Sequence, residues 1–465
     1  FVLQAPGIQS CTLSPCGRDL NLRMNKIHFN YSLKNIGLRK HHQYQKRLID
    51  KVESVIQRMR WKAHHFLNDK PKTEENNTFG LPSKKCAPPI IEMKSFEEDV
   101  IHLVSNVKFR KITDPFLNNI AEDLEKVNTS QNVLIFADKT RNVYEAAPET
   151  YNKLLTENIT KTYKLGSDVE CEDINSELQK ITNDLSISDR VDTMAKRPAF
   201  ITLKDHKENF DSNPKCRLIN PSKSELGKVS KVILDDINSN IRSTLNLNQW
   251  KNTQSVINWF QAICDKPNHT FLSFDIVEFY PSISEQLLDN VISWAKTLTD
   301  ITDQHISIIK HARKSLLFHE KKTWVKKNNQ SLFDVTMGSY DGAEICELVG
   351  LFILHKLSEK FGKNNVGLYR DDGLMLLKGP GNRSADRARK SLHSIFHQFG
   401  LKITAEVNNQ TVNFLDVTFN LREEKYSAYR KPNNEPLYID RRSNHPPSII
   451  KHIPKSINKR ISSLS

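Results

Sequence analysis

The apolar runs Thr270-Phe-Leu-Ser-Phe-Asp-Ile-Val277 and Val366-Gly-Leu-Tyr-Arg-Asp-Asp-Gly-Leu-Met-Leu-Leu377 decide the fold of this chain. Both have the composition of buried strands, yet both carry carboxylates that an apolar strand does not otherwise need. Asp275 lies near the end of the first run. Asp371 and Asp372 interrupt the second run, which predicts a hairpin with acidic residues at its tip. Two neighbouring strands of this kind would bring carboxylates from distant parts of the sequence to one cleft.

Carboxylates gathered at strand ends are the ligands that a pair of magnesium ions requires. Mg²⁺ takes oxygen ligands, and two ions about 3.5–4 Å apart can activate an attacking hydroxyl and stabilise a leaving group. Taken alone, the Asp-Asp-Gly at 371–373 is simply a favoured turn sequence. Asp275 on a second strand favours a site for two Mg²⁺ ions, with Mn²⁺ as an alternative metal.

The segments around these strands alternate between helical and strand patterns without a regular βαβ repeat. Apolar residues at three- and four-residue steps predict helices at 43–67, 95–107, 227–245, 285–297, 343–361 and 385–399. Short apolar or alternating runs predict strands at 132–137, 198–203, 216–220 and 412–421. A further hairpin over 317–335 is expected to turn at 326–329. This order predicts an α+β fold.

The composition favours a polyanionic partner. The chain contains 68 Lys and Arg against 54 Asp and Glu, a formal charge of +14, and cations placed on phosphates release counterions. Solubility alone would also explain this balance. No run approaches the roughly 18 apolar residues of a transmembrane helix, so we expect no membrane partner. The seven cysteines form no Cys-x-x-Cys pair, which disfavours a zinc module or a secreted disulfide framework and predicts an intracellular protein, nuclear or cytoplasmic.

Five segments, in this order along the chain, resemble the motifs of reverse transcriptases. Phe274 to Tyr280 is similar to motif A, an Asp followed five residues later by an aromatic residue. Thr336-Met-Gly-Ser339 opens like motif B, and Leu368 to Leu374 is similar to motif C. Phe399 to Lys402 and Asn413 to Val417 resemble motifs D and E.

Further segments resemble the Penelope-like retroelement reverse transcriptases. Phe200 to Lys207 and Cys216 to Ser222 are similar to the fingers hairpin of that family, and Tyr429 to Pro432 and Ser443 to Pro446 are similar to later segments. The resemblance implies a right-hand polymerase with fingers, an antiparallel palm sheet backed by helices, and a partial helical thumb. It also implies an RNA-directed DNA polymerase that extends a DNA primer on an RNA template with dNTPs.

This resemblance divides the chain into four parts. Residues 1–90 are expected to be a poorly ordered extension with one helix and a linker rich in Pro and Asn. Residues 91–262 would form an N-terminal helical region and the fingers, and 263–425 the palm with motifs A to E. Residues 426–465 would begin a thumb that we expect to be truncated. The oligomeric state is not predicted.

The resemblance implies a role for each motif residue. Asp275, Asp371 and Asp372 would be the catalytic metal ligands, with the backbone carbonyl of Ile276 as a further ligand. Tyr280 would exclude a 2′ hydroxyl by its bulk. The other nucleotide-binding candidates are the phosphate-binding cations Lys204 and Arg217, Gly338 and Ser339 for close backbone approach, and Lys402 as a general acid toward pyrophosphate.

Basic residues interleaved with aromatic residues predict contacts to nucleic-acid strands. The candidates are Lys207, Lys322, Trp324, Lys326, Arg430 and Lys431. A solvated basic surface is the simpler alternative.

One segment departs from the family pattern. The chain reads Ser339-Tyr-Asp-Gly-Ala-Glu344 where a Ser-Pro-like continuation is expected, and Asp341 and Glu344 would add negative charge near the nucleotide pocket. Two alternatives therefore stay open. The chain could be a catalytically decayed, basic nucleic-acid-binding protein, or an RNA-directed RNA polymerase, against which Tyr280 argues.

Overall fold

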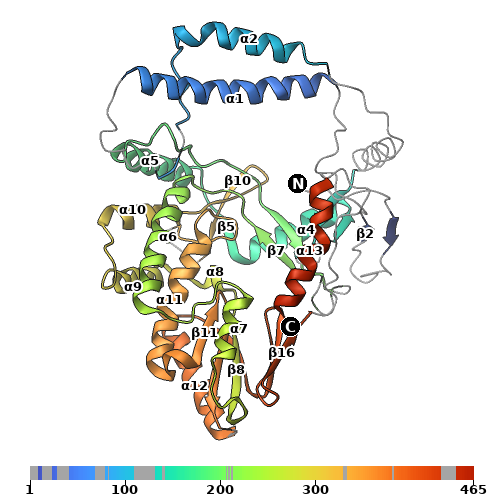
Figure 1. Ribbon diagram of the computed structural model, residues 1–465, viewed down its shortest axis with the longest axis vertical. Coiled ribbons are helices and arrows are strands. Elements are labelled where there is room, and N and C mark those ends of the chain that lie inside the picture. Colours follow the sequence, from blue (N-terminus) through green and yellow to red (C-terminus); the bar gives the residue numbers. More distant parts are fainter. Residues whose placement is uncertain are drawn as a thin grey trace.

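The computed structural model describes residues 9–12, 24–28, 41–68, 79–81, 83–108, 131–138, 142–205, 207, 210, 213–327, 332–379, 382–430 and 447–464. Figure 1 shows an elongated molecule, with a central sheet and its helices at one end and two long helices at the other. Several small sheets lie between them.

The central sheet contains four antiparallel strands in the order β11-β12-β8-β13. Their bounds are β8 His269–Ile276, β11 Val366–Tyr369, β12 Asp372–Lys378 and β13 Ile403–Asn409. β11 and β12 form a hairpin that turns at residues 370–371, and β12 pairs with β8 from one end to the other. The two carboxylate-bearing runs are therefore neighbouring strands, as the sequence predicts.

Different elements pack on the two faces of the central sheet. Leu272, Phe274 and Ile276 alternate along β8 and belong to the largest hydrophobic core. That core also takes residues from α6 Leu226–Leu245, α9 Glu285–Ala295, α10 Asp303–Ala312, α11 Gly342–Phe361 and α12 Asn382–Gln398. Phe271, on the other face, belongs to a second core with α7 Thr253–Gln261 and the sheet of β14 Thr411–Phe414, β15 Val417–Asn420 and β16 Lys425–Ala428. Because side chains alternate along a strand, Asp275 lies on the same face as Phe271.

Two glycines let large aromatic rings pack directly on the backbone of the β11–β12 hairpin. A Cβ atom added to Gly373 would lie 1.9 Å from the Phe274 ring, and one added to Gly367 would lie 2.2 Å from the Trp250 ring. Gly373 and Phe274 are also register partners across the sheet. The glycine after the paired aspartates is therefore required by packing, beyond its value in a turn.

A second group of elements surrounds a smaller core that includes Ile135, Leu155, Ile201 and Leu317. This group contains three sheets. One is the two-stranded sheet of β6 Phe200–Leu203 and β7 Cys216–Ile219. A three-stranded sheet has the order β5-β10-β9 (Tyr163–Leu165, Lys322–Lys326, Leu317–His319), and a four-stranded sheet has the order β1-β2-β4-β3 (Gln9–Thr12, Met24–His28, Val143–Ala146, Val133–Phe136). The helices α4 Pro148–Thr162 and α5 Val169–Asp184 accompany these sheets.

The hairpin of β9 and β10 turns earlier than the sequence predicts. His319 pairs with Lys322, so the turn is Glu320-Lys321, and the predicted turn at 326–329 is wrong. Both turn residues have positive φ, 49° and 60°, which matches a two-residue type I′ turn. Neither is Gly or Asn, so the sequence gives no signal for it. Lys326 consequently lies at the end of a strand.

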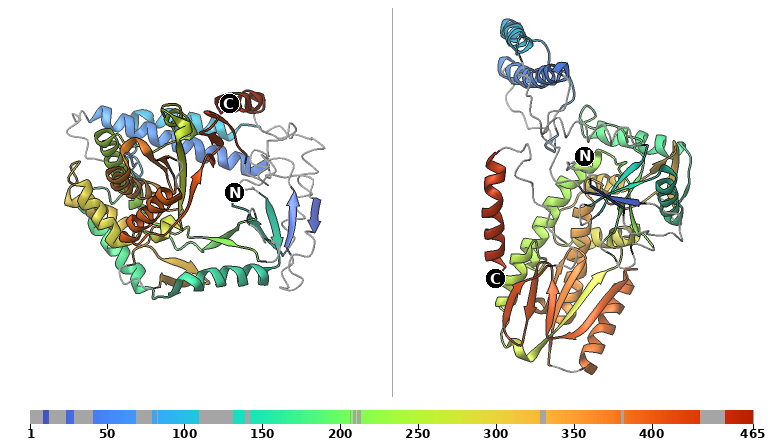
Figure 2. Two further views of the ribbon diagram at one scale, coloured as in Figure 1. Left: turned by 90° about the horizontal axis from the view of Figure 1, so that it is seen from below. Right: turned by 90° about the vertical axis from the view of Figure 1, so that its right-hand side faces the viewer.

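The helices α1 His41–Leu67 and α2 Lys94–Ser105 form a pair that stands away from the other elements, as the right-hand view of Figure 2 shows. Arg60 of α1 forms an ion pair with the nearly buried Glu97 of α2. The last described helix is α13 Pro447–Ser463. Within the described part of the chain, no helix has the length and apolar character of a membrane span.

The α+β class and the antiparallel sheet backed by helices are confirmed. The helices predicted at 43–67, 227–245 and 343–361 are α1, α6 and α11, and the strand pair predicted at 412–421 is β14 and β15. The division of the chain into four parts stays a prediction.

The variant Gly373→Ala is expected to lower the free energy of unfolding by at least about 1–3 kcal/mol, because the added methyl group meets the Phe274 ring. Urea unfolding measures this loss. The double variant Gly373→Ala/Phe274→Leu should be less destabilised than the sum of its single changes, since the two positions share one contact. Strict additivity would contradict the packing described.

Candidate active site

The carboxylates predicted to bind metal lie at one end of the central sheet. Asp275 and Asp372 are register partners on β8 and β12, and side chains of directly opposed residues project from the same face with Cβ atoms about 4.5–5.5 Å apart. Asp371 occupies the adjoining turn, where its carbonyl accepts a hydrogen bond of 3.0 Å from the Ile276 amide. Asp275 and Asp371 are exposed and Asp372 is half-buried. The structure thus places Asp275 next to Asp371 and Asp372, which follow it by almost 100 positions in the sequence.

Electrostatic effects place the Asp371 carboxylate near the Tyr280 side chain. The pKa of the Tyr280 hydroxyl is raised to about 12, mainly by burial and then by the neighbouring Cys346 and Asp371, whereas the charge of Arg370 opposes the shift. Burial likewise raises the pKa of the Cys346 thiol, and the charge of Asp371 adds to this shift, whereas the charge of Arg313 and a hydrogen bond with Tyr280 oppose it. The phenol and the thiol are therefore both protonated at neutral pH, beside an exposed carboxylate.

Tyr280 is held by a tight turn and by a glycine on α11. It lies in the short helix α8 Phe279–Ser282, which begins after Glu278 with a left-handed φ of 49°. A Cβ atom added to Gly342 would lie 3.4 Å from a Tyr280 ring carbon and 2.5 Å from the Ser339 hydroxyl. The lack of a side chain at 342 thus allows α11 to begin directly against both predicted nucleotide-binding residues.

The predicted phosphate-binding cations lie on the hairpin of β6 and β7. Burial lowers the pKa of Lys204, and the nearby positive charge of Arg217 lowers it further, whereas Asp138 and Glu278 oppose the shift. The influence of Glu278 places Lys204 near the turn that carries Tyr280. Arg217 donates a 2.8 Å hydrogen bond to Asp138, a partner that no sequence motif indicated. An incoming phosphate would compete with that carboxylate for the guanidinium.

The two acidic residues in the segment that departs from the family pattern, Asp341 and Glu344, are each neutralised by a basic side chain. Asp341 is wholly buried, forms an ion pair with the equally buried Arg313, and accepts a hydrogen bond of 2.5 Å from Ser230. Burial lowers the pKa of Arg313 to about 10, so the guanidinium stays charged at neutral pH. Glu344 forms an ion pair with Lys231. The expectation that both acids add negative charge to the nucleotide pocket is therefore corrected, because each has its own cation.

The residues predicted to bind nucleic-acid strands have different surroundings. Lys326 donates hydrogen bonds to Asp334 (2.7 Å) and to the carbonyl of Pro281 (3.1 Å), directly beside Tyr280. Trp324 is half-buried against the smaller core. Lys207, Lys322 and Arg430 are exposed, as is the nucleotide-binding candidate Lys402, and Lys431 lies outside the described residues.

Gly338 and Ser339 lie just before α11, as predicted. Gly338 has a φ of 103°, which favours glycine, and Ser339 donates a 3.0 Å hydrogen bond to the Thr336 carbonyl. The glycine at 338 and this hydrogen bond help to order the loop beside Tyr280.

The donor set suits a hard cation, because it consists of carboxylate and carbonyl oxygens. Across the described residues, no three or more His, Cys, Asp or Glu side chains are already gathered closely enough to hold a metal ion. The aspartates fit a magnesium site in chemical type and in their place on adjoining strand ends.

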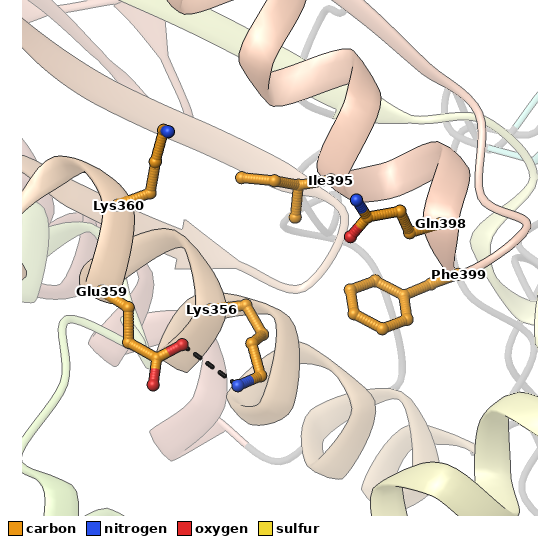
Figure 3. A pocket seen from close by; sticks show the side chains of 6 residues that line it. All are labelled: Lys356, Glu359, Lys360, Ile395, Gln398 and Phe399. Carbon is orange, nitrogen blue, oxygen red and sulfur yellow. Dashed lines mark hydrogen bonds and ion pairs between the residues drawn. The ribbon is translucent and has the colours of Figure 1, made fainter.

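A separate hollow of about 270 Å³ lies between the last turns of α11 and α12 (Figure 3). It is lined by Lys356, Glu359, Lys360, Ile395, Gln398 and Phe399. Its α11 residues lie roughly 20 Å along the helix from Gly342, at about 1.5 Å per residue. None of the residues predicted for the site contributes to it.

No family model and no curated protein sequence matches this chain. A structure of telomerase from Candida albicans with a fragment of telomeric RNA is similar, with a TM-score of 0.47 and 11% identity over 84% of this chain and 76% of that chain. Apo telomerase from Candida tropicalis gives 0.47 and 11% over 82% and 66%. The RNA-dependent RNA polymerase of a human picobirnavirus gives 0.38 and 11% over 73% and 72%. At this level of similarity, the chemical roles rest on the residues of this chain.

Removing Arg313 is expected to destabilise the fold strongly. Arg313→Met leaves Asp341 as an unpaired buried charge and should lower the free energy of unfolding by about 3–5 kcal/mol. The double variant Arg313→Met/Asp341→Leu should regain most of that loss. Lys314→Met is the matched control, because it removes a partly exposed ion pair with Glu177 and should change stability by less than about 1 kcal/mol. Equal losses for the two single variants in urea unfolding would refute the importance of the buried pair.

Proposed function

We propose that this chain is an RNA-directed DNA polymerase of a retrotransposable element, of the Penelope-like type, that extends a primer 3′ end by two-metal nucleotidyl transfer. The observation that carries this proposal is the register pairing of Asp275 with Asp372, with Asp371 in the adjoining turn beside Tyr280. The proposal assigns the central sheet and its helices to a palm, and the β6–β7 hairpin to the fingers.

Asp275, Asp371 and Asp372 would hold two Mg²⁺ ions, with the carbonyl of Ile276 as a further ligand. Bound there, the ions would supply activation of the primer hydroxyl and stabilisation of the leaving pyrophosphate. Like charges at strand ends repel each other, so the carboxylates are expected to draw together only around cations. Lys402, exposed at the start of β13, would donate a proton toward pyrophosphate.

Lys204 and Arg217 would bind the triphosphate of the incoming nucleotide, and Tyr280 would lie against its sugar. Tyr280 is half-buried in α8 and its ring faces Gly342 at the start of α11, so this helix end would limit movement of the ring away from an added 2′ hydroxyl. This rigidity supports deoxyribonucleotides as substrates and disfavours an RNA-directed RNA polymerase. An RNA template and a DNA primer are the proposed partners, in keeping with the formal charge of +14.

A catalytically decayed nucleic-acid-binding protein is the second candidate. The main support for this candidate is the negative charge that Asp341 and Glu344 would add near the nucleotide pocket. The ion pairs of Asp341 and Glu344 remove that argument, and all three proposed metal ligands are present. The active enzyme is therefore the better-supported function.

Primer extension on an RNA template with dNTPs and Mg²⁺ tests the enzymatic proposal. Asp371→Asn keeps the size of the side chain but removes its charge. It should lower the extension rate by at least about 1,000-fold, because a catalytic metal supplies several kcal/mol of transition-state stabilisation. Asp303→Asn, a change at an almost fully exposed carboxylate (97%) on α10, should keep the wild-type rate. Absence of extension by a folded wild-type protein would exclude the polymerase.

The variant Tyr280→Ala tests the sugar-excluding role. The ratio of kcat/KM for dNTPs over rNTPs should fall by about 10- to 100-fold, the scale of one steric contact in a binding pocket. Tyr280→Phe should keep the wild-type ratio, since the bulk of the ring is responsible. A wild-type enzyme that uses rNTPs as efficiently as dNTPs would remove this role.

A further inference from the structure

Two lysine ammoniums lie over the ring of Tyr340, in the segment that departs from the family pattern, and a third cation lies near one of them. The Lys223 ammonium lies 4.1 Å from the centroid of the Tyr340 ring, and the Lys228 ammonium lies 5.1 Å from it. Both distances are within the range of cation–π attraction. The exposed Arg197 is the third cation. Its backbone is hydrogen-bonded to the hydroxyl of Ser222, the residue before Lys223, and its charge acts on Lys223.

These cations are held close to one another despite their mutual repulsion. Burial lowers the pKa of Lys223, and the positive charges of Arg197 and Lys228 lower it further. Lys228 has a carboxylate partner in Glu225. Within the described part of the chain, no carboxylate forms an ion pair with Lys223 or Arg197. Uncompensated cations fixed side by side have the character of an anion site.

The Tyr340 cluster adjoins the proposed nucleotide pocket. Lys223 donates a 2.9 Å hydrogen bond to the carbonyl of Gly338. Tyr340 follows Ser339 directly, and it packs on α6 where a Cβ atom added to Gly227 would lie 3.3 Å from the Tyr340 Cβ. Two residues further on, Gly342 lies against the Tyr280 ring. The cluster therefore sits on the same loop that borders the sugar-excluding tyrosine.

The Tyr340 cluster is distinct from the cations proposed for the triphosphate. The positive charges that act on Lys204 are those of Arg217 and Lys207, whereas those that act on Lys223 are Arg197 and Lys228. The two groups share no member. Because the proposed triphosphate already has cations on the β6–β7 hairpin, the second group is available for another phosphate-bearing ligand.

We propose that Arg197, Lys223 and Lys228, ordered by the ring of Tyr340, bind the phosphate backbone of the template strand where it passes the nucleotide pocket. This inference rests on the proposed polymerase function. The tyrosine would hold the two lysine ammoniums in place before the strand arrives, which lowers the entropy lost on binding. The unusual residue after Ser339 thus becomes part of the template path.

The salt dependence of template binding tests this site. The Kd of a primed RNA template is measured without nucleotides across a range of salt concentrations. Lys223→Gln and Arg197→Gln should each weaken binding and reduce the slope of log K against log salt by about 0.7–0.9, the value of one phosphate contact. Lys360→Gln removes the same charge at the hollow of Figure 3 and should keep the wild-type slope. An unchanged slope in both cluster variants would overturn the proposal.

Two substitutions of Tyr340 distinguish the contribution of its aromatic ring from that of the neighbouring positive charges. Tyr340→Leu should weaken template binding about two- to fivefold, the scale of one exposed cation–π contact, while Tyr340→Phe should bind like wild type. Circular dichroism and thermal unfolding establish that each variant is folded. Equal binding by the leucine and phenylalanine variants would refute the role of the ring.

Steady-state kinetics distinguish the two sources of phosphate. For Lys223→Gln, the KM for dNTP should stay at the wild-type value at saturating template. A raised KM with an unchanged salt slope would assign the cluster to the triphosphate and overturn the template proposal. Because the binding assay needs no catalysis, a wild-type protein that binds with the expected slope but never extends a primer would refute the polymerase alone.

Discussion

The antiparallel register of β8 and β12 sets the geometry on which the functional proposal depends. That register places Asp275 opposite Asp372, and it is determined on the opposite face of the same strands, where Phe274 covers the bare backbone of Gly373. A shift of either strand by one residue would turn its own carboxylate toward the helical core, away from the carboxylate of the other strand. Packing on one face of the sheet therefore determines the chemistry on the other.

Buried charge in the segment after Ser339 has a structural explanation. Arg313 and Asp341 are both inaccessible to solvent, and such a pair adds little net stability but makes the loss of either partner severe. The pair joins the end of α10 to the start of α11, next to the loop of Gly338 and Ser339. The segment 339–344 departs from the motif B pattern, yet its buried ion pair makes it an ordered part of the structure beside Tyr280.

The sequence alone predicts the strands that carry acids and the helices with regular apolar spacing, because each of these depends on local patterns. The role of Tyr280 rests on the resemblance to motif A and stays a prediction. The sequence did not predict that Arg313 is buried, since its partner Asp341 becomes a neighbour only when α10 and α11 both pack against α6. Lys326 resembled a surface cation for the same reason. The turn at Glu320-Lys321 was missed because its positive φ values are carried by residues that rarely adopt them.

The hydrogen bonds of Lys326 connect two parts of the structure. Its ammonium donates hydrogen bonds to the carbonyl of Pro281 and to the carboxylate of Asp334. The same carboxylate also accepts a 2.9 Å hydrogen bond from Tyr163 on β5. The sheet of β5, β10 and β9 is therefore fastened to the turn that carries Tyr280. A displacement of that sheet relative to the central sheet would move the α8 backbone at Pro281, and with it the adjacent ring of Tyr280.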